Sequence, residues 1–426
     1  MYIENYGCQM NISDTEIIIS ILSKNGFLLT NDLKKADIIM LNTCAIRKKA
    51  ELSIKKRLDN LKYLKLNNQK IPLFGILGCL SKSEKYLFSN LIDFSVGPNS
   101  YRKIPDIIRF VMMNESENQN ETYENISPSS YAIKRKITTF LSITRGCDNM
   151  CTFCIVPFTR GRERSSSPYS IINECERLYE NGYKEVTLLG QNVDSYLWFI
   201  IDFSKLLDLL ASKIPFMRIR FSTSNPHDMS DRVIEVISKH SNICKHIHLP
   251  VQSGSNKILK LMNRKYTREK YLFLIQKIRS IVPECSISHD IITGFCNEKE
   301  EDHLETISLM DEVKYDYGYM FSYSPRPRTY AYKKFMDNVP KDVKKRRLKE
   351  IIDLQRIHSL FRMKKYLGTI QEVLIEGESK KNNRDWYGRN TQNIVVVFPK
   401  KFSKIGEIVF VKITNCTSAT LIGKID

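Results

Sequence analysis

Three cysteines stand at C-x3-C-x2-C spacing in one short run, Cys147, Cys151 and Cys154. The run offers no obvious fourth ligand, whereas a structural zinc ion normally takes four protein ligands. Three local thiolates instead suit a [4Fe–4S] cluster that keeps one iron open for another molecule. Two other interpretations stay open: chance burial of small apolar thiols, and a zinc site completed by a distant His227 or His289. The spacing favours the iron–sulfur interpretation.

Three further cysteines follow three apolar runs near the amino terminus. Residues 2–6, 38–42 and 73–77 have the pattern of buried parallel strands, and helical patterns separate them. A cysteine follows directly or almost directly after each run, at Cys8, Cys44 and Cys79. Because the carboxyl ends of parallel strands share one edge of an open α/β sheet, we expect these thiols to meet in space. Unrelated buried thiols are the alternative.

The middle of the chain alternates strand-like and helical patterns, which predicts a partial (β/α)6 barrel over residues 137–366 with a basic helical end. Strands are expected at 138–143, 185–189, 217–222, 246–249, 286–292 and 317–323. Helices are expected between them, for example at 168–181, 268–281 and 300–313. Active sites of such barrels lie on the loops after the strands, and the Cys147 loop follows the first expected strand. A cofactor is therefore expected there.

The two ends of the chain have patterns of their own. Residues 1–112 predict a small parallel α/β domain, and the polar residues 113–136 predict a linker. Residues 367–426 predict a five-stranded antiparallel β-barrel, a shape typical of nucleic-acid-binding modules. Within it Trp386 begins an aromatic run beside Arg389 that suits stacking on bases, with a core position for the tryptophan as the alternative.

Composition narrows the class of protein. A chain of 426 residues exceeds what one core usually organises, so two or three domains are expected. The net charge of +19 points to a polyanionic partner such as nucleic acid, unless it reflects compositional drift. No run reaches the roughly 18 apolar residues of a membrane span, and no secretory signal opens the chain. Eleven cysteines without dense spacing argue against a secreted disulfide scaffold, so a cytoplasmic protein is expected.

Positive charge is concentrated in residues 338–366, which hold ten Lys/Arg against three acidic residues. We expect this segment to bind RNA, and neutralising Lys344, Arg346 and Arg347 to weaken that binding and flatten its salt dependence. A solvated helix face is the alternative.

The whole chain resembles the MiaB-type radical-SAM methylthiotransferases, which modify tRNA, and its carboxyl-terminal part is similar to a TRAM module. The shared segments occur in the same order along the chain: Tyr6-Gly-Cys-Gln-Met-Asn11, Leu41-Asn-Thr-Cys-Ala-Ile-Arg47, Gly78-Cys79, Gly97-Pro98, Cys147 to Arg164, Leu188-Leu-Gly-Gln-Asn192, His248-Leu-Pro-Val-Gln-Ser-Gly254 and Ser324-Pro-Arg-Pro327.

The resemblance implies two [4Fe–4S] clusters and S-adenosylmethionine as cofactors. One cluster, whose open iron chelates S-adenosylmethionine, would be held by Cys147, Cys151 and Cys154. An auxiliary cluster involved in sulfur insertion would be held by Cys8, Cys44 and Cys79. Candidates for the S-adenosylmethionine pocket, with a structural role as the alternative, are Gln191, Ser224 and Gln252. No side chain is expected to be the catalyst, because the cofactors carry the radical chemistry.

The activity implied by the resemblance is methylthiolation of C2 of N6-isopentenyl-adenosine at position 37 of tRNA, with S-adenosylmethionine as radical source and methyl donor. The expected partners are the tRNA anticodon loop and an external one-electron donor, with no membrane, and the enzyme is expected to be a monomer. A sister methylthiotransferase acting on threonylcarbamoyl-adenosine or on a ribosomal-protein aspartate is one alternative. A zinc-bound RNA-binding protein without enzymatic activity is the other.

Overall fold

The structure is a computed structural model that describes residues 1–44, 48–67, 72–80, 91–113 and 137–425. The chain divides into two compact units. The amino-terminal unit comprises Met1–Lys136, Phe140–Asp148 and Ile155–Ser166, and the larger unit comprises Ile137–Thr139, Asn149–Cys154 and Ser167–Asp426. Apart from its first residue, the expected linker at 113–136 lies outside the described residues.

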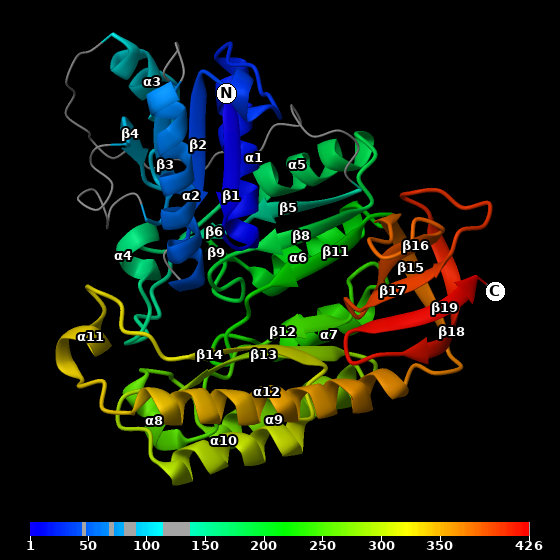
Figure 1. The fold of residues 1–426 in the computed structure, drawn as a ribbon. Helices are drawn as coiled ribbons and strands as arrows, with labels where there is room; N and C mark the ends of the chain where they lie inside the picture. Colours follow the sequence, from blue (N-terminus) through cyan, green and yellow to red (C-terminus); the bar gives the residue numbers. More distant parts are fainter. Residues whose placement is uncertain (45–47, 68–71, 81–90, 114–136, 426) are drawn as a thin grey trace. The chain divides into compact units, whose positions relative to one another are not determined.

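The amino-terminal unit is built on a four-stranded parallel sheet whose strands lie side by side in chain order (Figure 1). The strands are β1 (Tyr2–Tyr6), β2 (Ile38–Thr43), β3 (Leu73–Gly78) and β4 (Phe94–Val96). The helices of this unit are α1 (Gln9–Lys24), α2 (Lys48–Asn67), α3 (Ile104–Met112) and the short α4 (Val156–Arg160). The three strands predicted from apolar runs are confirmed, and β4 has too few residues to produce such a run.

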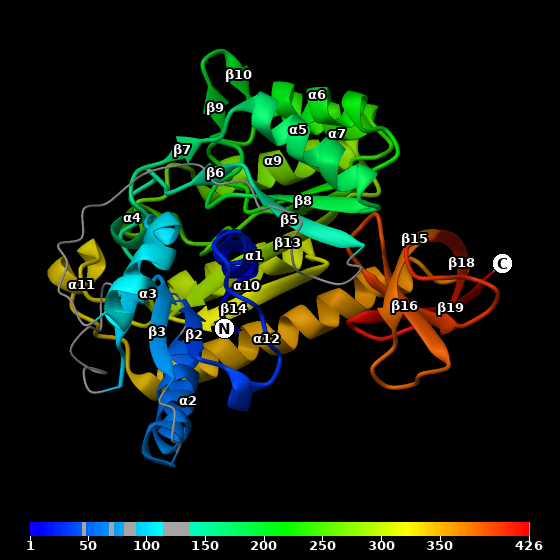
Figure 2. The same ribbon diagram turned by 90° about the horizontal axis from the view of Figure 1, so that it is seen from above.

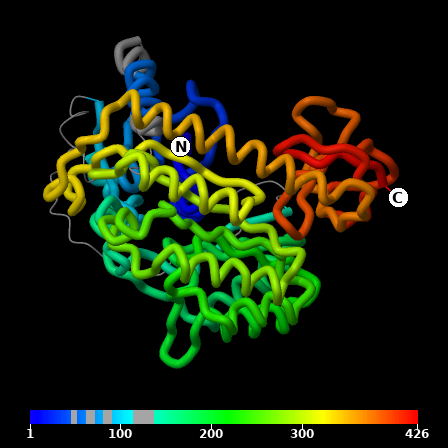
Figure 3. The backbone as a smooth tube through the Cα atoms, turned by 90° about the horizontal axis from the view of Figure 1, so that it is seen from below, coloured from blue at the N-terminus to red at the C-terminus, as the bar shows by residue number. Residues whose placement is uncertain are grey.

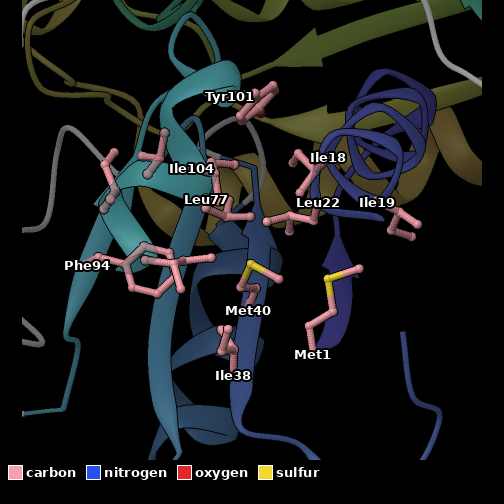
Figure 4. Packing of buried hydrophobic residues seen from close by; sticks show 13 residues of the cluster. Met1, Ile18, Ile19, Leu22, Ile38, Met40, Leu77, Phe94, Tyr101 and Ile104 are labelled. Atoms are coloured by element: carbon pink, nitrogen blue, oxygen red, sulfur yellow. The ribbon is translucent and has the colours of Figure 1, made fainter. Parts of the chain in front are cut away.

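Alternation along β2 separates two apolar cores, one on each face of the sheet. Ile38 and Met40 belong to the core that also includes Leu22 of α1, and Figure 4 shows these side chains packed together. Ile39 and Leu41 belong to the other core, which is closed by residues of α2. Each such buried side chain contributes roughly 1.5–3 kcal/mol relative to exposure. The sheet edge that carries Cys8, Cys44 and Cys79 is therefore anchored on both faces.

The predicted partial barrel lies in the larger unit except for residues 140–142 of β5, which belong to the amino-terminal unit. Its strands form two three-stranded sheets, ordered β11-β8-β5 and β12-β13-β14. A parallel backbone bridge between Ile219 of β11 and Ile243, just before β12, joins the two sheets. The strands are β5 (Thr138–Ser142), β8 (Glu185–Leu189), β11 (Arg218–Ser222), β12 (His246–His248), β13 (Ser286–Thr293) and β14 (Tyr317–Ser322).

Helices follow the barrel strands as predicted, and Figure 2 shows α5, α6 and α7 together beside β8. The Asp202 and Thr267 side chains cap α6 and α9, each accepting a hydrogen bond from the backbone three residues on. The helices are α5 (Pro168–Glu180), α6 (Phe203–Lys213), α7 (Asp231–Lys239), α8 (Asn256–Leu261), α9 (Arg268–Ile281), α10 (Glu300–Val313) and α11 (Tyr330–Lys334). Two short ribbons complete the arrangement, β6 (Thr144–Arg145) with β7 (Arg164–Ser165) and β9 (Leu197–Trp198) with β10 (Ile201–Asp202).

The carboxyl-terminal region is a closed five-stranded barrel, as predicted, with the strand order β15-β16-β17-β19-β18. All its strand pairs are antiparallel except β17 with β19, which is parallel. The strands are β15 (Ile370–Glu378), β16 (Asp385–Asn390), β17 (Val395–Pro399), β18 (Ile408–Cys416) and β19 (Thr420–Ile425). Helix α12 (Lys341–Lys364), which packs against β14 and α10, leads into this barrel (Figure 3).

The loop between β16 and β17 is tied to the beginnings of the barrel strands. Arg220 donates from Nη2 to the Asn390 carbonyl (2.7 Å), and its Nε lies 2.9 Å from the carboxylate of Glu185. Ser286 donates from Oγ to the Gln392 carbonyl (2.6 Å). Glu185 and Ser286 are the first residues of β8 and β13, and Arg220 is the middle residue of β11. The small barrel is thus fixed at the end opposite the loops that follow the strands.

Candidate metal centres and nucleic-acid interface

The Cys147 loop is held by backbone contacts at both ends. The Cys147 amide donates to the Gly161 carbonyl (3.2 Å), and Gly146 has a φ of +79°. A Cβ at Gly146 would lie 2.1 Å from the Arg162 carbonyl oxygen, so only glycine fits there. Farther along, the Cys154 amide donates to the Cys151 carbonyl (3.0 Å), which makes a tight turn. The backbone thus presents three thiols from one short segment.

The amino-terminal cysteines all stand at the carboxyl edge of the parallel sheet, where Cys44 contacts Cys8. Cys8 precedes α1 directly, Cys44 directly follows β2, and Cys79 directly follows β3. The Cys79 amide donates to the carbonyl of Thr43, the residue before Cys44 (3.0 Å). A hydrogen bond from Cys44, assisted by backbone amides and by the charge of Arg160, lowers the pKa of Cys8 to about 6. A thiolate is the form that binds metal, so this edge favours ligation.

Two asparagines fix this edge. The Asn11 side chain donates to the Thr43 carbonyl (3.0 Å), and its Oδ1 lies 3.4 Å from Cys8 Sγ. Asn42 donates back to the Asn11 carbonyl (2.9 Å). Both side chains are fully buried, where unpaired polar groups are costly. Their mutual hydrogen bonds therefore hold the start of α1 and the end of β2 in one arrangement.

A buried ion pair lies on the same side of α1, close to these thiols. Asp14 is fully buried, and Arg160 of α4 donates to its Oδ2 at 2.8 Å. Arg145 approaches Oδ1 of Asp14 at 3.3 Å, and the Tyr101 hydroxyl donates to Oδ2 at 3.3 Å. The charge of Arg160 acts on both Cys8 and Cys79. Asp14 thus holds a cation beside the amino-terminal cysteines.

Both cysteine sets have the donor chemistry of a [4Fe–4S] cluster. In a cubane cluster each thiolate binds a different iron, so the sulfurs need not converge on one point. Within the described ranges, no three His, Cys, Asp or Glu side chains converge as ligands of a single metal ion. His289, considered above as a zinc ligand, lies fully buried with Nε2 2.8 Å from the Gln355 side-chain oxygen.

The three predicted S-adenosylmethionine residues all follow barrel strands. The Ser224 side chain interacts with the Asp194 carboxyl group. The other two carry a buried oxygen that makes no hydrogen bond within the described part of the chain, Gln191 Oε1 and Gln252 Oε1. Buried oxygens of this kind are normally paired, so each exception needs an explanation. An amino-acid ligand with ammonium and hydroxyl donors is one that fits, so the residues present suit S-adenosylmethionine.

Gln252 is also conformationally strained, with a φ of +70°. Its backbone is fixed in this geometry because its amide donates to the Asp290 carbonyl (2.8 Å) and its carbonyl accepts from Ile292 (3.0 Å). Strain of this type costs of order 1–3 kcal/mol and concentrates at binding sites. The backbone therefore directs the side chain after β12 at the expense of local stability.

Sequence reasoning missed Asp194, which follows β8 three residues after Gln191. The carboxylate accepts from the Asn225 amide (2.9 Å) and interacts with the Ser224 hydroxyl. Burial raises the pKa of Asp194 to about 7. The acidic residue in the Asn192-Val-Asp194 sequence was the available signal, and its perturbed pKa makes it a candidate site residue.

The expectation for the basic helix was wrong for two of its three residues. Lys344 and Arg347 are buried, where Lys344 pairs with Asp337 and Arg347 lies 2.9 Å from Glu298. Arg346 is exposed but pairs with Glu300 and Glu350. These cations serve the packing of α12. Exposed cations of the same helix, among them Lys341, Lys345, Lys349 and Lys364, remain available to face a polyanion.

The aromatic run of the small barrel is mainly structural. Trp386 packs against the barrel core, and Lys400 lies over its ring at 4.2 Å. Arg389 pairs with Glu376 at 2.8 Å. A fully exposed aromatic side chain is found instead at Phe402, in the loop between β17 and β18, within the run Lys400-Lys-Phe-Ser-Lys404. A lysine-flanked aromatic residue is the signal that could have found it.

We expect Phe402→Ala to weaken tRNA binding about 5- to 100-fold, because stacking of one base contributes about 1–3 kcal/mol. Filter binding or fluorescence anisotropy at fixed salt measures this loss. Phe199→Ala, at the tip of the β9–β10 hairpin, is a matched control because Phe199 is also largely exposed but is flanked in sequence by Trp198 and Ile200 instead of lysines. Equal affinities of the two variants would remove Phe402 from the interface.

Comparison with known proteins follows this division of the chain. Residues 1–96 match an uncharacterized protein family, UPF0004, residues 141–310 match the radical SAM superfamily, and residues 364–425 match the TRAM domain. A tRNA-2-methylthio-N(6)-dimethylallyladenosine synthase from Karelsulcia muelleri (strain GWSS) is 57% identical over 452 residues, which cover 100% of this chain and 98% of that protein. The protein of the same name from Flavobacterium psychrophilum is 51% identical over 450 residues, covering 100% and 93%.

Solved structures share the fold at low identity. The radical S-adenosylmethionine methyltransferase TsrM from Kitasatospora setae, with cobalamin and a [4Fe-4S] cluster bound, has a TM-score of 0.60 at 11% identity and covers 78% of this chain and 76% of its own. The cobalamin-dependent S-adenosylmethionine radical enzyme OxsB has a TM-score of 0.55 at 12% identity. The match covers 83% of this chain and 56% of the OxsB chain.

The partial barrel, the Cys147 loop on its first strand and these matches define a radical S-adenosylmethionine enzyme. Within that class, the chain belongs to the family of tRNA-2-methylthio-N(6)-dimethylallyladenosine synthases. S-adenosylmethionine and two [4Fe–4S] clusters are its cofactors, and tRNA is its substrate. The non-enzymatic alternative is excluded. In the part of the chain that the structure describes, no helix combines the length and apolar character needed to cross a bilayer.

Proposed function

We propose that this enzyme attaches a methylthio group to C2 of N6-isopentenyl-adenosine at position 37 of tRNA. The observation that carries the proposal is the presence of two separate cysteine trios in a chain of this family. One trio follows the first barrel strand, and the other stands at the carboxyl edge of the amino-terminal sheet. A single cluster with S-adenosylmethionine suffices for radical formation, so the second trio indicates the additional sulfur step.

We assign the radical-forming cluster to Cys147, Cys151 and Cys154, and the auxiliary cluster to Cys8, Cys44 and Cys79. When bound, these clusters and S-adenosylmethionine supply the radical, the sulfur and the methyl group, which side chains cannot provide. The protein residues position the reactants and exclude water. Asn11 and Asn42 fix the edge that carries the auxiliary trio, and Asp14 holds Arg160 beside it.

We assign the S-adenosylmethionine pocket to the ends of β8, β11 and β12. Gln191, Ser224 and Gln252 present oxygens that accept hydrogen bonds, which suits the ammonium and ribose hydroxyl groups of this ligand. Asp194 is added to this set on the basis of its buried, raised-pKa carboxyl group. These side chains would orient the ligand on the open iron.

The remaining assignments concern the surroundings of the reaction. We propose that the enzyme binds tRNA at the anticodon loop, since the unstacked bases of that loop are accessible to proteins. An external one-electron donor, a cytoplasmic location and a monomeric enzyme complete the proposal. For the domain limits we propose 1–112, a linker at 113–136, the radical-SAM barrel with its basic helix at 137–366, and the TRAM-like domain at 367–426.

The test is nucleoside analysis of tRNA from a bacterial strain whose own methylthiolating genes have been deleted, with and without this chain. We expect methylthio-isopentenyl-adenosine to appear only when the chain is expressed. Appearance of methylthio-threonylcarbamoyl-adenosine, or of a methylthio group on a ribosomal protein, would assign the chain to a sister activity instead. Expression without any new methylthio product would contradict the proposal.

A further inference from the structure

Arg264 makes a direct contact with one of the cysteines of the barrel loop. Its Nη1 lies 3.4 Å from Cys151 Sγ, within hydrogen-bond range for sulfur. Its other donors are also engaged: Nη2 donates to the Pro250 carbonyl (3.0 Å) and Nε to the Tyr266 hydroxyl (2.9 Å). The guanidinium also lies over the Tyr266 ring, 5.1 Å from its centroid. The group is therefore held in one orientation, pointing at sulfur.

The segment around Arg264 clamps the cysteine loop as well. Thr152 donates from its amide to the Met262 carbonyl (3.1 Å) and from Oγ1 to the Leu261 carbonyl (2.8 Å). Asn263, with a φ of +56°, donates to the Met150 carbonyl (3.0 Å). The residues on both sides of Cys151 are thus fixed to the segment that carries Arg264. The contact with sulfur is part of a built arrangement and does not depend on one mobile side chain.

The charge of Arg264 is not neutralised locally. Among the described residues, its partners are a thiol, a carbonyl and a hydroxyl, and none is a carboxylate. The other arginine near a cysteine trio differs in this respect, because Arg160 forms an ion pair with buried Asp14. Arg264 therefore brings close to a full positive charge to Cys151, and its surroundings are largely desolvated.

We propose that Arg264 is a positioning residue that sets the reduction potential of the cluster held by Cys147, Cys151 and Cys154, raising it by an N–H to sulfur hydrogen bond and an uncompensated positive charge. The proposal rests on the assignment of those cysteines to the cluster. Reduction adds one electron to the cluster, and a nearby cation stabilises the more negative form. Hydrogen bonds to ligand sulfur act in the same direction and are a known determinant of cluster potential.

The test uses full-length protein in which Cys8, Cys44 and Cys79 are replaced by alanine, so that only one cluster contributes to the signal. Its midpoint potential is measured by a reductive titration followed by electron paramagnetic resonance, without tRNA. We expect Arg264→Gln to shift the potential to lower values. Arg264→Lys should produce a smaller shift in the same direction, because an ammonium group keeps the charge but cannot reproduce all three hydrogen bonds.

Arg268→Gln is the matched control, because it removes an arginine four residues away whose partners lie on α10. Its potential should equal that of the parent. If Arg264→Gln does not retain the cluster, the midpoint potential of the Arg264→Lys variant is the deciding measurement. An unchanged potential in whichever Arg264 variant holds a full cluster overturns the proposal. Because the measurement involves no tRNA and no methylthio product, this failure is distinguishable from failure of the proposed function.

Discussion

Replacing Cys8, Cys44 and Cys79 together by alanine will leave an enzyme that still cleaves S-adenosylmethionine but attaches no methylthio group. The three thiols stand at one edge of the amino-terminal sheet, outside the barrel loop that holds Cys147. The variant should bind about four irons per chain where the parent binds about eight. Replacing Cys147, Cys151 and Cys154 instead should abolish both cleavage and product. Iron analysis and chromatography of 5′-deoxyadenosine and tRNA nucleosides measure these outcomes.

The structure supplies a control for this experiment among the other cysteines. Burial raises the pKa of Cys175 to about 12, so this thiol stays protonated, whereas the pKa of Cys8 is lowered to about 6. Only a thiolate binds iron, so Cys175→Ala should keep the full iron content. Methylthio product from the variant without Cys8, Cys44 and Cys79 would show that the sulfur step needs no auxiliary cluster.

Arg160→Met should lower the free energy of unfolding by about 3 kcal/mol, because it leaves the fully buried Asp14 with only the more distant Arg145 as a charged partner. Denaturant unfolding, followed by the fluorescence of tyrosines or by circular dichroism, measures this loss. The nearby Arg162→Met is the control. The Arg162 side chain is 77% exposed and pairs with Asp148 at the surface, whereas Arg160 is 5% exposed. Its loss should cost less than about 0.5 kcal/mol.

A second substitution shows how much of the stability lost in Arg160→Met comes from the unpaired charge and how much from lost packing. Adding Asp14→Asn should restore part of the lost stability, since no uncompensated charge then remains buried. Equal destabilisation by Arg160→Met and Arg162→Met would show that the buried ion pair contributes no more than a surface one.

Periodic patterns predicted most of the fold because they reflect burial directly. The runs at β2, β3 and β8 are largely apolar since both faces of those strands are covered. β4 has three residues, too few for a periodic signal, and the parallel pairing of β17 with β19 depends on barrel closure rather than on local sequence. Strand β16, which contains Trp386, was not predicted as a strand. Polar residues interrupt its alternation of apolar and polar side chains, so that only the aromatic residues were noticed.

Candidate site residues could be predicted where their spacing or the sheet topology indicates them. The role of a residue could not be predicted where it depends on a contact made only in the folded chain. The six candidate cysteine ligands are predicted from local spacing and from the rule that parallel strands share one carboxyl edge. The roles of Lys344 and Arg347 could not be predicted, because their partners Asp337 and Glu298 are distant or unremarkable in sequence. The same holds for Arg264, whose contact with Cys151 joins residues 113 positions apart.

The attachment of the small barrel through Arg220 and Ser286 has a consequence for substrate choice. The small barrel is attached near the beginnings of the strands. Active sites of such barrels lie on the loops after the strands. We therefore expect the length of the strands to set the distance between RNA contacts on the small barrel and the base that reacts. An RNA should be preferred when it spans that distance. Short oligonucleotides that carry the correct base but lack this span should bind more weakly, because they lose the contacts with the small barrel.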